Sequence, residues 1–190
     1  MKRRIITISG VPGSGKSSAA AGIARALGYE HFSSGDLFRK MAAERGISIE
    51  EMNLVAEKQR EIDHGVDELL VTLGKEKDDF VIDSRTAFHW IPASFRVFLE
   101  LDPAIAARRT FAQIREEGRV SQAGSSLEQV LENTLRRIES EKKRFRDLYQ
   151  IDFTDVKNYD LVVDTGANDL EKVIGIVIRA YRAWLAAPEA

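Results

Sequence analysis

Apolar and polar residues at the start of the chain follow a strand pattern and then a helix pattern. The run from Ile5 to Ile8 is apolar and mostly β-branched and is closed by Gly10, which is typical of a buried central strand. After a glycine-rich turn, Ser17 to Leu27 is rich in alanine and ends at Gly28, which predicts a helix. The order strand, glycine loop, helix indicates the opening unit of an α/β fold.

Four further segments predict the other strands, with helical patterns between them. They are Glu30 to Phe32, Phe80 to Ile82, Phe95 to Leu101 and Leu161 to Val163. From Asp169 on, helical spacing predicts a last helix that packs on the sheet through Leu170, Val173, Ile174, Val177, Ile178 and Tyr181. Because strands alternate with helices, we predict a three-layer α/β fold with a five-stranded parallel sheet, in one domain over residues 1–190.

The composition is globular, with 44% hydrophobic and 31% charged residues among 190. The formal net charge of −2 supplies no overall basic field, so we expect no nucleic-acid partner. The chain has no cysteine, which excludes disulfides, thiolate metal ligands and a cysteine nucleophile.

The sequence also lacks the patterns of export and of membrane insertion. The basic residues 1–4 precede an apolar run that is shorter than the roughly 7–15 residues of a signal peptide. The uncharged stretch from Thr86 to Phe95 is far shorter than the ~20 residues of a membrane span. We therefore expect a cytoplasmic protein without a membrane partner. Separately, we expect a monomer.

One segment is basic although the chain is slightly acidic. Arg108 to Arg146 contains ten Lys or Arg residues against six Glu. This excess indicates either an anionic ligand or a solvated helix with pairs such as Arg137 and Glu141, four residues apart. The polar stretch from Gly118 to Ser126 is a candidate mobile lid.

The motif GxxxxGK[ST] occupies Gly10 to Ser17, directly after a strand and directly before a helix. In that context it predicts a P-loop, whose backbone N–H groups and helix N-terminus surround phosphate oxygens. Lys16 would reach the β- and γ-phosphates of ATP, and the Ser17 hydroxyl would bind Mg²⁺. The predicted ATP-binding residues are Gly10, Pro12, Gly13, Ser14, Gly15, Lys16, Ser17 and Ser18. A guanine-binding Asn-Lys-x-Asp motif is absent, which argues against a regulatory GTPase.

An acidic residue closes the apolar strand Phe80 to Asp83. At the carboxyl edge of a parallel sheet, the Asp83 carboxylate would lie near the Mg²⁺ position. The alternative is that Asp83 caps the following turn. Arg85 comes two residues later and can point into the crevice where ligands of such sheets bind.

The segment from Ser33 to Arg39 predicts the start of another helix. Ser34 is a natural N-cap, and Asp36 and Arg39 are three residues apart, so they share a face. Spacing alone leaves two interpretations open: a pair that binds a sugar or base and a phosphate, or a surface ion pair.

Five segments together carry a resemblance to a known family. They are GVPGSGKSS, SSGDLFRKMAAERGISIEE, EID with Asp67 after it, RRIESEKKRFRDLYQID and YDLVVDT. In this order and at these separations the chain resembles the short cytidylate kinases of the archaeal type, within the nucleoside monophosphate kinase group of P-loop proteins. The resemblance extends over roughly Ile5 to Ile178.

The resemblance implies three regions and a set of site residues. The core would be residues 1–33, 77–108 and 150–190, the monophosphate-binding region 34–76 and the lid region 109–149. The acceptor nucleotide would be bound by Ser34, Gly35, Asp36, Arg39, Asp63 and Arg85. The catalytic residues would be Lys16, Arg85, Arg109, Arg115, Arg137 and Arg144, and Mg²⁺ would be held at Ser17 and Asp83.

The chain departs from the family pattern after the third strand. Ser84 stands where the family usually has glycine, which adds a side chain beside the acceptor phosphate. His89 and Trp90 make the next segment more aromatic than expected, and either they stack on a base or they form a wedge under a loop.

The implied reaction transfers the γ-phosphoryl group of ATP, with Mg²⁺, to CMP or dCMP. The acceptor phosphate is already anionic, so no general base is required. The alternatives are a P-loop kinase for another nucleotide or for a small hydroxyl acceptor such as shikimate, and a noncatalytic nucleotide-binding protein. A hydroxyl acceptor would require Asp36 or Asp83 as a general base.

Overall fold

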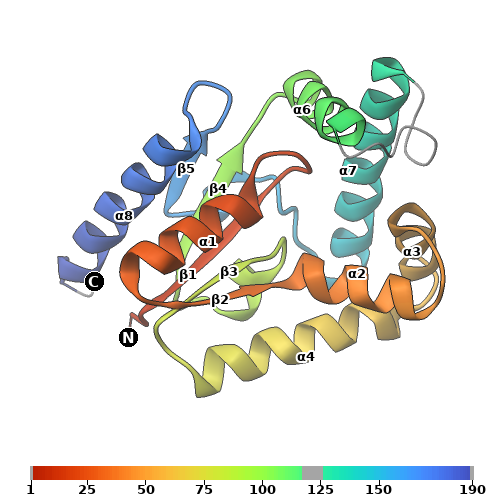
Figure 1. Ribbon diagram of the computed structural model, residues 1–190. Helices are drawn as coiled ribbons and strands as arrows, with labels where there is room; N and C mark the ends of the chain where they lie inside the picture. The colour runs from red at the N-terminus through yellow and green to blue at the C-terminus, as the bar shows by residue number, and fades with distance from the viewer. Residues whose placement is uncertain (1, 117–125, 189–190) are drawn as a thin grey trace.

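The computed structural model describes residues 2–116 and 126–188, and five parallel strands form its centre (Figure 1). The strands are β1 (Ile5–Gly10), β2 (Glu30–Ser33), β3 (Phe80–Asp83), β4 (Phe95–Glu100) and β5 (Leu161–Asp164). They lie in the order β2-β3-β1-β4-β5, and each neighbouring pair is parallel. The predicted five-stranded parallel sheet is confirmed, and every strand begins at the predicted residue.

Helices connect the strands and cover the sheet. They are α1 (Lys16–Leu27), α2 (Ser34–Glu44), α3 (Ile49–Ala56), α4 (Arg60–Glu76), α5 (Ala87–Trp90), α6 (Pro103–Glu116), α7 (Leu127–Tyr149) and α8 (Leu170–Ala186), with a 3-10 turn at Val156–Asn158. No helix within the described ranges combines the length and the apolar character that a membrane span requires.

One face of the sheet packs against α1 and α8. Successive side chains of a strand point to opposite faces, and Ile6 and Ile8 of β1 share this one. Val177 and Tyr181 of α8 are buried against it, as the helical pattern predicts. Leu170 is the exception, with 47% of its surface exposed. It begins α8, and the helix joins the buried cluster only from Val173 on.

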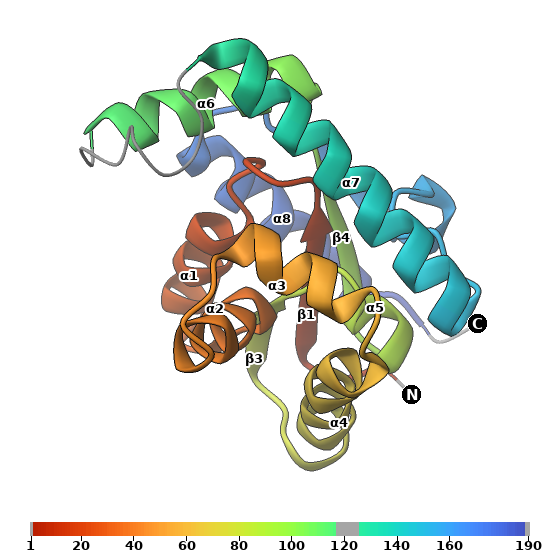
Figure 2. The ribbon, with the colours of Figure 1, turned by 90° about the vertical axis from the view of Figure 1, so that its right-hand side faces the viewer.

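The opposite face packs against α4 and α5, with the C-terminal part of α7 beside them. Ile5 and Phe80 point to this side and belong to the same buried cluster as Leu70 of α4. Phe98 of β4 clusters with Phe145 of α7. Helices α3 and α7 are in contact near the carboxyl ends of the strands, which brings together segments that are far apart in the sequence (Figure 2).

The expected lid loop and the expected cap of α2 have different outcomes. The candidate lid from Gly118 to Ser126 lies outside the described residues, apart from Ser126, which caps α7.

The prediction that Ser34 caps α2 is wrong by one residue. Ser33 keeps the extended backbone of β2, and its hydroxyl accepts a hydrogen bond from the Asp36 backbone N–H at 3.3 Å, so Ser33 is the N-cap.

Candidate active site

The loop between β1 and α1 has the backbone of an anion-binding turn. Gly10, Gly13 and Gly15 have φ angles of 150°, 77° and 81°, which favour glycine. A Cβ atom at Gly10 would lie 2.4 Å from the backbone oxygen of Leu99, so this position is also closed to a side chain by space. Gly15 is the N-cap of α1 and supplies no side-chain cap, which leaves the first N–H groups of the helix for a ligand.

Lys16 lies across this loop. Its Nζ donates a hydrogen bond to the backbone oxygen of Val11 at 2.8 Å. Burial, and next the positive charge of Arg85, lower the pKa of Lys16 well below its ordinary value. The ammonium group is therefore a poorly solvated cation that an anionic ligand would stabilise.

The Asp83 carboxylate at the end of β3 is held by three side chains. Its Oδ2 accepts hydrogen bonds from the hydroxyls of Ser17 and Ser33, both at 2.9 Å, and its Oδ1 lies 2.8 Å from Nε2 of His31. Burial acts to raise the pKa of Asp83, but the hydrogen bonds from these side chains hold it below its ordinary value. Among the described residues the carboxylate contacts β2 and α1 rather than the turn after β3, so the turn-capping interpretation is not supported.

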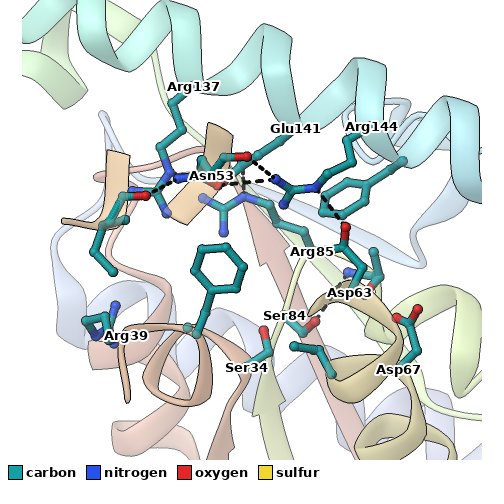
Figure 3. A pocket seen from close by; sticks show the side chains of 16 residues that line it. Ser34, Arg39, Asn53, Asp63, Asp67, Ser84, Arg85, Arg137, Glu141 and Arg144 are labelled. Carbon is teal, nitrogen blue, oxygen red and sulfur yellow. Dashed lines mark hydrogen bonds and ion pairs between the residues drawn. The ribbon is translucent and has the colours of Figure 1, made fainter. Parts of the chain in front are cut away.

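A cluster of arginines and acids lies between α7 and the ends of β3 and α4 (Figure 3). Glu141 forms ion pairs with Arg85 and, at 3.0 Å, with Arg137. Arg144 forms an ion pair with Asp63 at 3.1 Å. Burial acts to raise the pKa of Glu141, but the positive charges of Arg85 and Arg137 outweigh it and lower the pKa. The carboxylate is therefore ionised at neutral pH.

Two adjoining cavities open at this cluster. The larger, about 690 Å³, extends from the P-loop residues Lys16 and Ser17 past Asp83 toward α6 and α7. The smaller, about 210 Å³, extends from the cluster toward Asp63 and Asp67 of α4. Both cavities are lined by Ser34, Gly35, Arg39, Asn53, Ser84, Arg85 and Arg137. The site therefore has two compartments that share a cationic wall.

Comparison with known proteins identifies the family. A family model described as an AAA domain matches residues 9–128. The chain is 36% identical over 179 residues to the cytidylate kinase of Methanothrix thermoacetophila, a match that covers 94% of this chain and 98% of that one. It is 39% identical over 181 residues to the cytidylate kinase of Halorubrum lacusprofundi, with coverage of 95% and 90%.

The chain belongs to the cytidylate kinase family. Solved structures with more distant sequences share its fold. Shikimate kinase from Bacteroides thetaiotaomicron superposes with a TM-score of 0.60 at 13% identity and covers 92% of this chain and 96% of its own. An uncharacterized protein from Eubacterium ventriosum reaches a TM-score of 0.65 at 18% identity, with coverage of 94% and 98%.

Most residues predicted for this cytidylate kinase family site line one of the two cavities. The P-loop residues that line the larger one are Pro12, Gly13, Gly15, Lys16, Ser17 and Ser18. Those predicted for the acceptor that line the smaller one are Ser34, Gly35, Arg39, Asp63 and Arg85, together with Arg137 and Arg144. Gly10 and Ser14 belong to the P-loop but line neither cavity. Ser14 is buried, and Gly10 lies close to the backbone of Leu99. Asp36 is exposed and forms an ion pair with Arg39, so the surface-pair interpretation describes it in this structure.

Two predicted arginines lie elsewhere. Arg109 donates a hydrogen bond to the backbone oxygen of Thr165 at 2.7 Å, and the guanidinium of Arg115 lies 5.8 Å from the ring of Phe111. Neither residue lines the two cavities described above. A role for Arg109 or Arg115 at the phosphates stays a prediction.

The aromatic segment after β3 forms a wedge. Trp90 packs edge-on against His89 and Tyr149, between α4 and α7, and lines neither cavity. Base stacking by Trp90 or His89 is therefore not supported by this structure. Ser84 is buried and does line both cavities, and its hydroxyl accepts a hydrogen bond from the Thr86 backbone N–H at 3.3 Å.

Sequence reasoning missed two residues of the shared wall and its surroundings. Asn53 lines both cavities, and nothing in its local sequence marks it. Glu141 was expected only as the partner of Arg137 on a solvated helix, yet the residue is 2% exposed. The cluster of Arg85 with Glu141 depends on two segments that are 56 positions apart in the chain, a proximity that spacing along one helix cannot indicate.

Proposed function

We propose that this chain transfers the γ-phosphoryl group of ATP to the α-phosphate of CMP or dCMP, giving ADP and the nucleoside diphosphate. The observation that carries the proposal is the pair of adjoining cavities with their shared arginines. A donor bound at the P-loop and an acceptor bound near Asp63 would meet with their phosphates at that wall. In-line phosphoryl transfer needs this positioning and a positive field more than it needs covalent chemistry.

The larger cavity fits ATP with Mg²⁺. Ser17 and Asp83 supply the hydroxyl and carboxylate oxygens that Mg²⁺ prefers, and they would hold the ion. When bound, Mg²⁺ would neutralise charge on the transferring phosphate.

The residues around the shared wall would divide the phosphates between them. Lys16 would bind the β- and γ-phosphates, while Arg39, Arg85 and Arg137 would bind the acceptor phosphate and the charge that develops in transfer. No general base is needed, because a phosphate oxygen is the nucleophile. Asp83 is a poor candidate for one, since its pKa lies below the ordinary value and the carboxylate is therefore a weak base. A hydroxyl acceptor such as shikimate is therefore disfavoured.

The far end of the smaller cavity suits a pyrimidine ring. Phe38, Val66 and Phe145 supply apolar surface there, and Asp63 supplies a carboxylate. The ion pair with Arg144 uses Oδ2 of Asp63, which leaves Oδ1 for a ligand. The 4-amino group of cytosine can donate a hydrogen bond to a carboxylate, whereas uracil presents a carbonyl oxygen at the same position. This difference supports CMP over UMP as the acceptor.

Helices α2 to α4, within residues 34–76, would form the monophosphate-binding region. The lid region, 109–149, would include α7 and the part of α6 that follows residue 108. Closure of such a lid would exclude water, which otherwise competes with the acceptor for the phosphoryl group.

The proposal is tested by coupled ADP release with Mg-ATP and each of CMP, dCMP, UMP, AMP, GMP and shikimate, beside a reaction without acceptor. Preference for CMP or dCMP is the expected result. Preference for shikimate, or ATP binding without turnover on any acceptor, would refute it.

Arg39→Ala is expected to raise the KM for CMP by about tenfold, because one charge-assisted contact to the acceptor phosphate is lost. The KM for ATP should change by less than about twofold, since the P-loop is intact. Steady-state kinetics with each substrate varied in turn measure both values. The control is Lys40→Ala, which removes an exposed cation from the next position of α2. An effect of Arg39→Ala confined to ATP would contradict the assignment.

A further inference from the structure

Glu141 lies between two arginines that come from different parts of the fold. Its Oε1 accepts a hydrogen bond from Nε of Arg137 at 3.0 Å, one helical turn earlier on α7. Its Oε2 pairs with Nε of Arg85, which follows β3. Figure 3 shows these side chains together on the α7 side of the pocket, facing Ser34 and Ser84. The Glu141 side chain is 3% exposed, so water does not compete for its oxygens.

The two arginines would separate without an anion between them. Both are cations, and the Arg85 side chain is only 15% exposed, so their repulsion is weakly screened. Burial lowers the pKa of Arg85 to about 10; the charge of Glu141 opposes this shift and that of Arg137 adds to it. Glu141 is therefore the group that makes this pair of cations compatible with burial.

The geometry of these contacts leaves the arginines usable. Glu141 contacts each guanidinium at Nε, the nitrogen that is bonded to the aliphatic part of the arginine side chain. Arg85 and Arg137 line both cavities, and their contacts with Glu141 use Nε. The terminal N–H groups would then serve a phosphate, which guanidinium groups bind through paired N–H donors.

We propose that Glu141 is a positioning residue that holds Arg85 and Arg137 in the arrangement the acceptor phosphate requires. It touches no substrate atom in this role and acts through the two guanidinium groups. The inference rests on the proposed function and deepens it, because it explains how the cationic wall is preformed before the nucleotide binds. A preformed wall should favour turnover more than binding, since its donors are already oriented when charge develops in transfer.

The test compares Glu141→Gln and Glu141→Asp with Glu132→Gln. Glu132 forms the same kind of ion pair with Arg136, which lies four residues later on α7, at 2.7 Å. Unlike Glu141, this pair is at the surface, and the side chains of Glu132 and Arg136 are each 67% exposed. We expect Glu141→Gln to lower kcat by about 10- to 30-fold while the KM for CMP changes by less than about threefold, because removal of a negative charge beside the phosphate offsets the loss of orientation. Glu132→Gln should leave both constants within about twofold.

Two further measurements, turnover with different bases and the affinity for CMP, distinguish a positioning role from the alternatives. A positioning role predicts that kcat falls by the same factor for CMP, dCMP and UMP. Calorimetric titration with CMP should show binding retained within about threefold, as for the KM. A change in the ratio of CMP to UMP turnover would instead assign Glu141 to the base, and unchanged kcat in a folded variant would leave it only structural; either result overturns the proposal.

Folding and the proposed function are tested separately. If circular dichroism shows that Glu141→Gln does not fold, Glu141→Asp is the deciding variant. It keeps the negative charge but shortens the side chain by one methylene. We expect its kcat to fall by about fivefold and its melting temperature to stay near that of the wild type. Wild-type kcat in Glu141→Asp would then overturn the proposal. Absence of kinase activity in the wild type would refute the proposed function itself, whereas an active wild type with active Glu141 variants refutes only the positioning role.

Discussion

Lys16→Ala is expected to lower kcat by about 1,000-fold or more, because it removes the cation that neutralises the β- and γ-phosphates during transfer. The structure places Nζ of Lys16 2.8 Å from the backbone oxygen of Val11, directly over the P-loop. The side chain is half-buried, and burial, followed by the positive charge of Arg85, lowers its pKa. An ammonium group in that setting gains more from a bound polyphosphate than a solvated one would.

Coupled ADP release with CMP as acceptor measures the loss. The control is Arg25→Ala, which removes an exposed cation from the same helix, α1, and should leave kcat within about twofold. A thermal melt of each variant separates loss of chemistry from loss of fold. Lys16 has no salt-bridge partner among the described residues, so its removal leaves no buried carboxylate unpaired. Activity of Lys16→Ala within tenfold of the wild type would exclude the P-loop role.

Asp63→Asn is expected to reduce the preference for CMP over UMP by about 100-fold, measured as the ratio of their kcat/KM values. In the proposed site the carboxylate would accept a hydrogen bond from the cytosine amino group, whereas an amide could turn its N–H₂ toward the carbonyl of uracil. The control is Glu68→Gln, the same chemical change on the exposed side of α4. An unchanged ratio in folded Asp63→Asn would exclude Asp63 from the base site.

The same residue predicts a pH dependence. Burial raises the pKa of Asp63 to about 6, against the opposing charge of Arg144. Above pH 6 the group is a carboxylate, which would accept a hydrogen bond from cytosine, and below pH 6 the protonated form could donate one to uracil. The CMP to UMP ratio should therefore fall as the pH drops through about 6 and should not vary with pH in Asp63→Asn. Ionisation of the acceptor phosphate affects CMP and UMP alike, because both nucleotides carry the same group, so its effect cancels in the ratio.

The elements of the core could be predicted because their signals are local. Each strand is a short run bounded by turn residues, and the P-loop needs closely spaced glycines whose backbone angles other residues rarely adopt. The family resemblance extended the prediction to Arg39, Arg85 and Asp63, which the structure brings to one cavity. The errors were small and also local, as at Ser34, where the strand continued for one more residue and moved the cap to Ser33.

Two positions in and near the shared wall could not be predicted from the sequence. Asn53 reaches both cavities because α3 packs against α7, and Trp90 is kept away from them because α4 and Tyr149 cover it. Such positions depend on how helices pack against one another, and the spacing of residues along one helix reports only which of them share a face.

The sequence by itself determined the parallel sheet, the P-loop and the family, because strand and helix periods and a contiguous phosphate-binding motif are written in neighbouring residues. Only the tertiary structure decided which charges meet. It buried Glu141 between Arg85 and Arg137, and it turned Arg109 toward Thr165 and away from the cavities. The physical reason is that an ion pair forms where side chains from distant segments converge in a low-dielectric site, and that convergence exists only after the layers have packed.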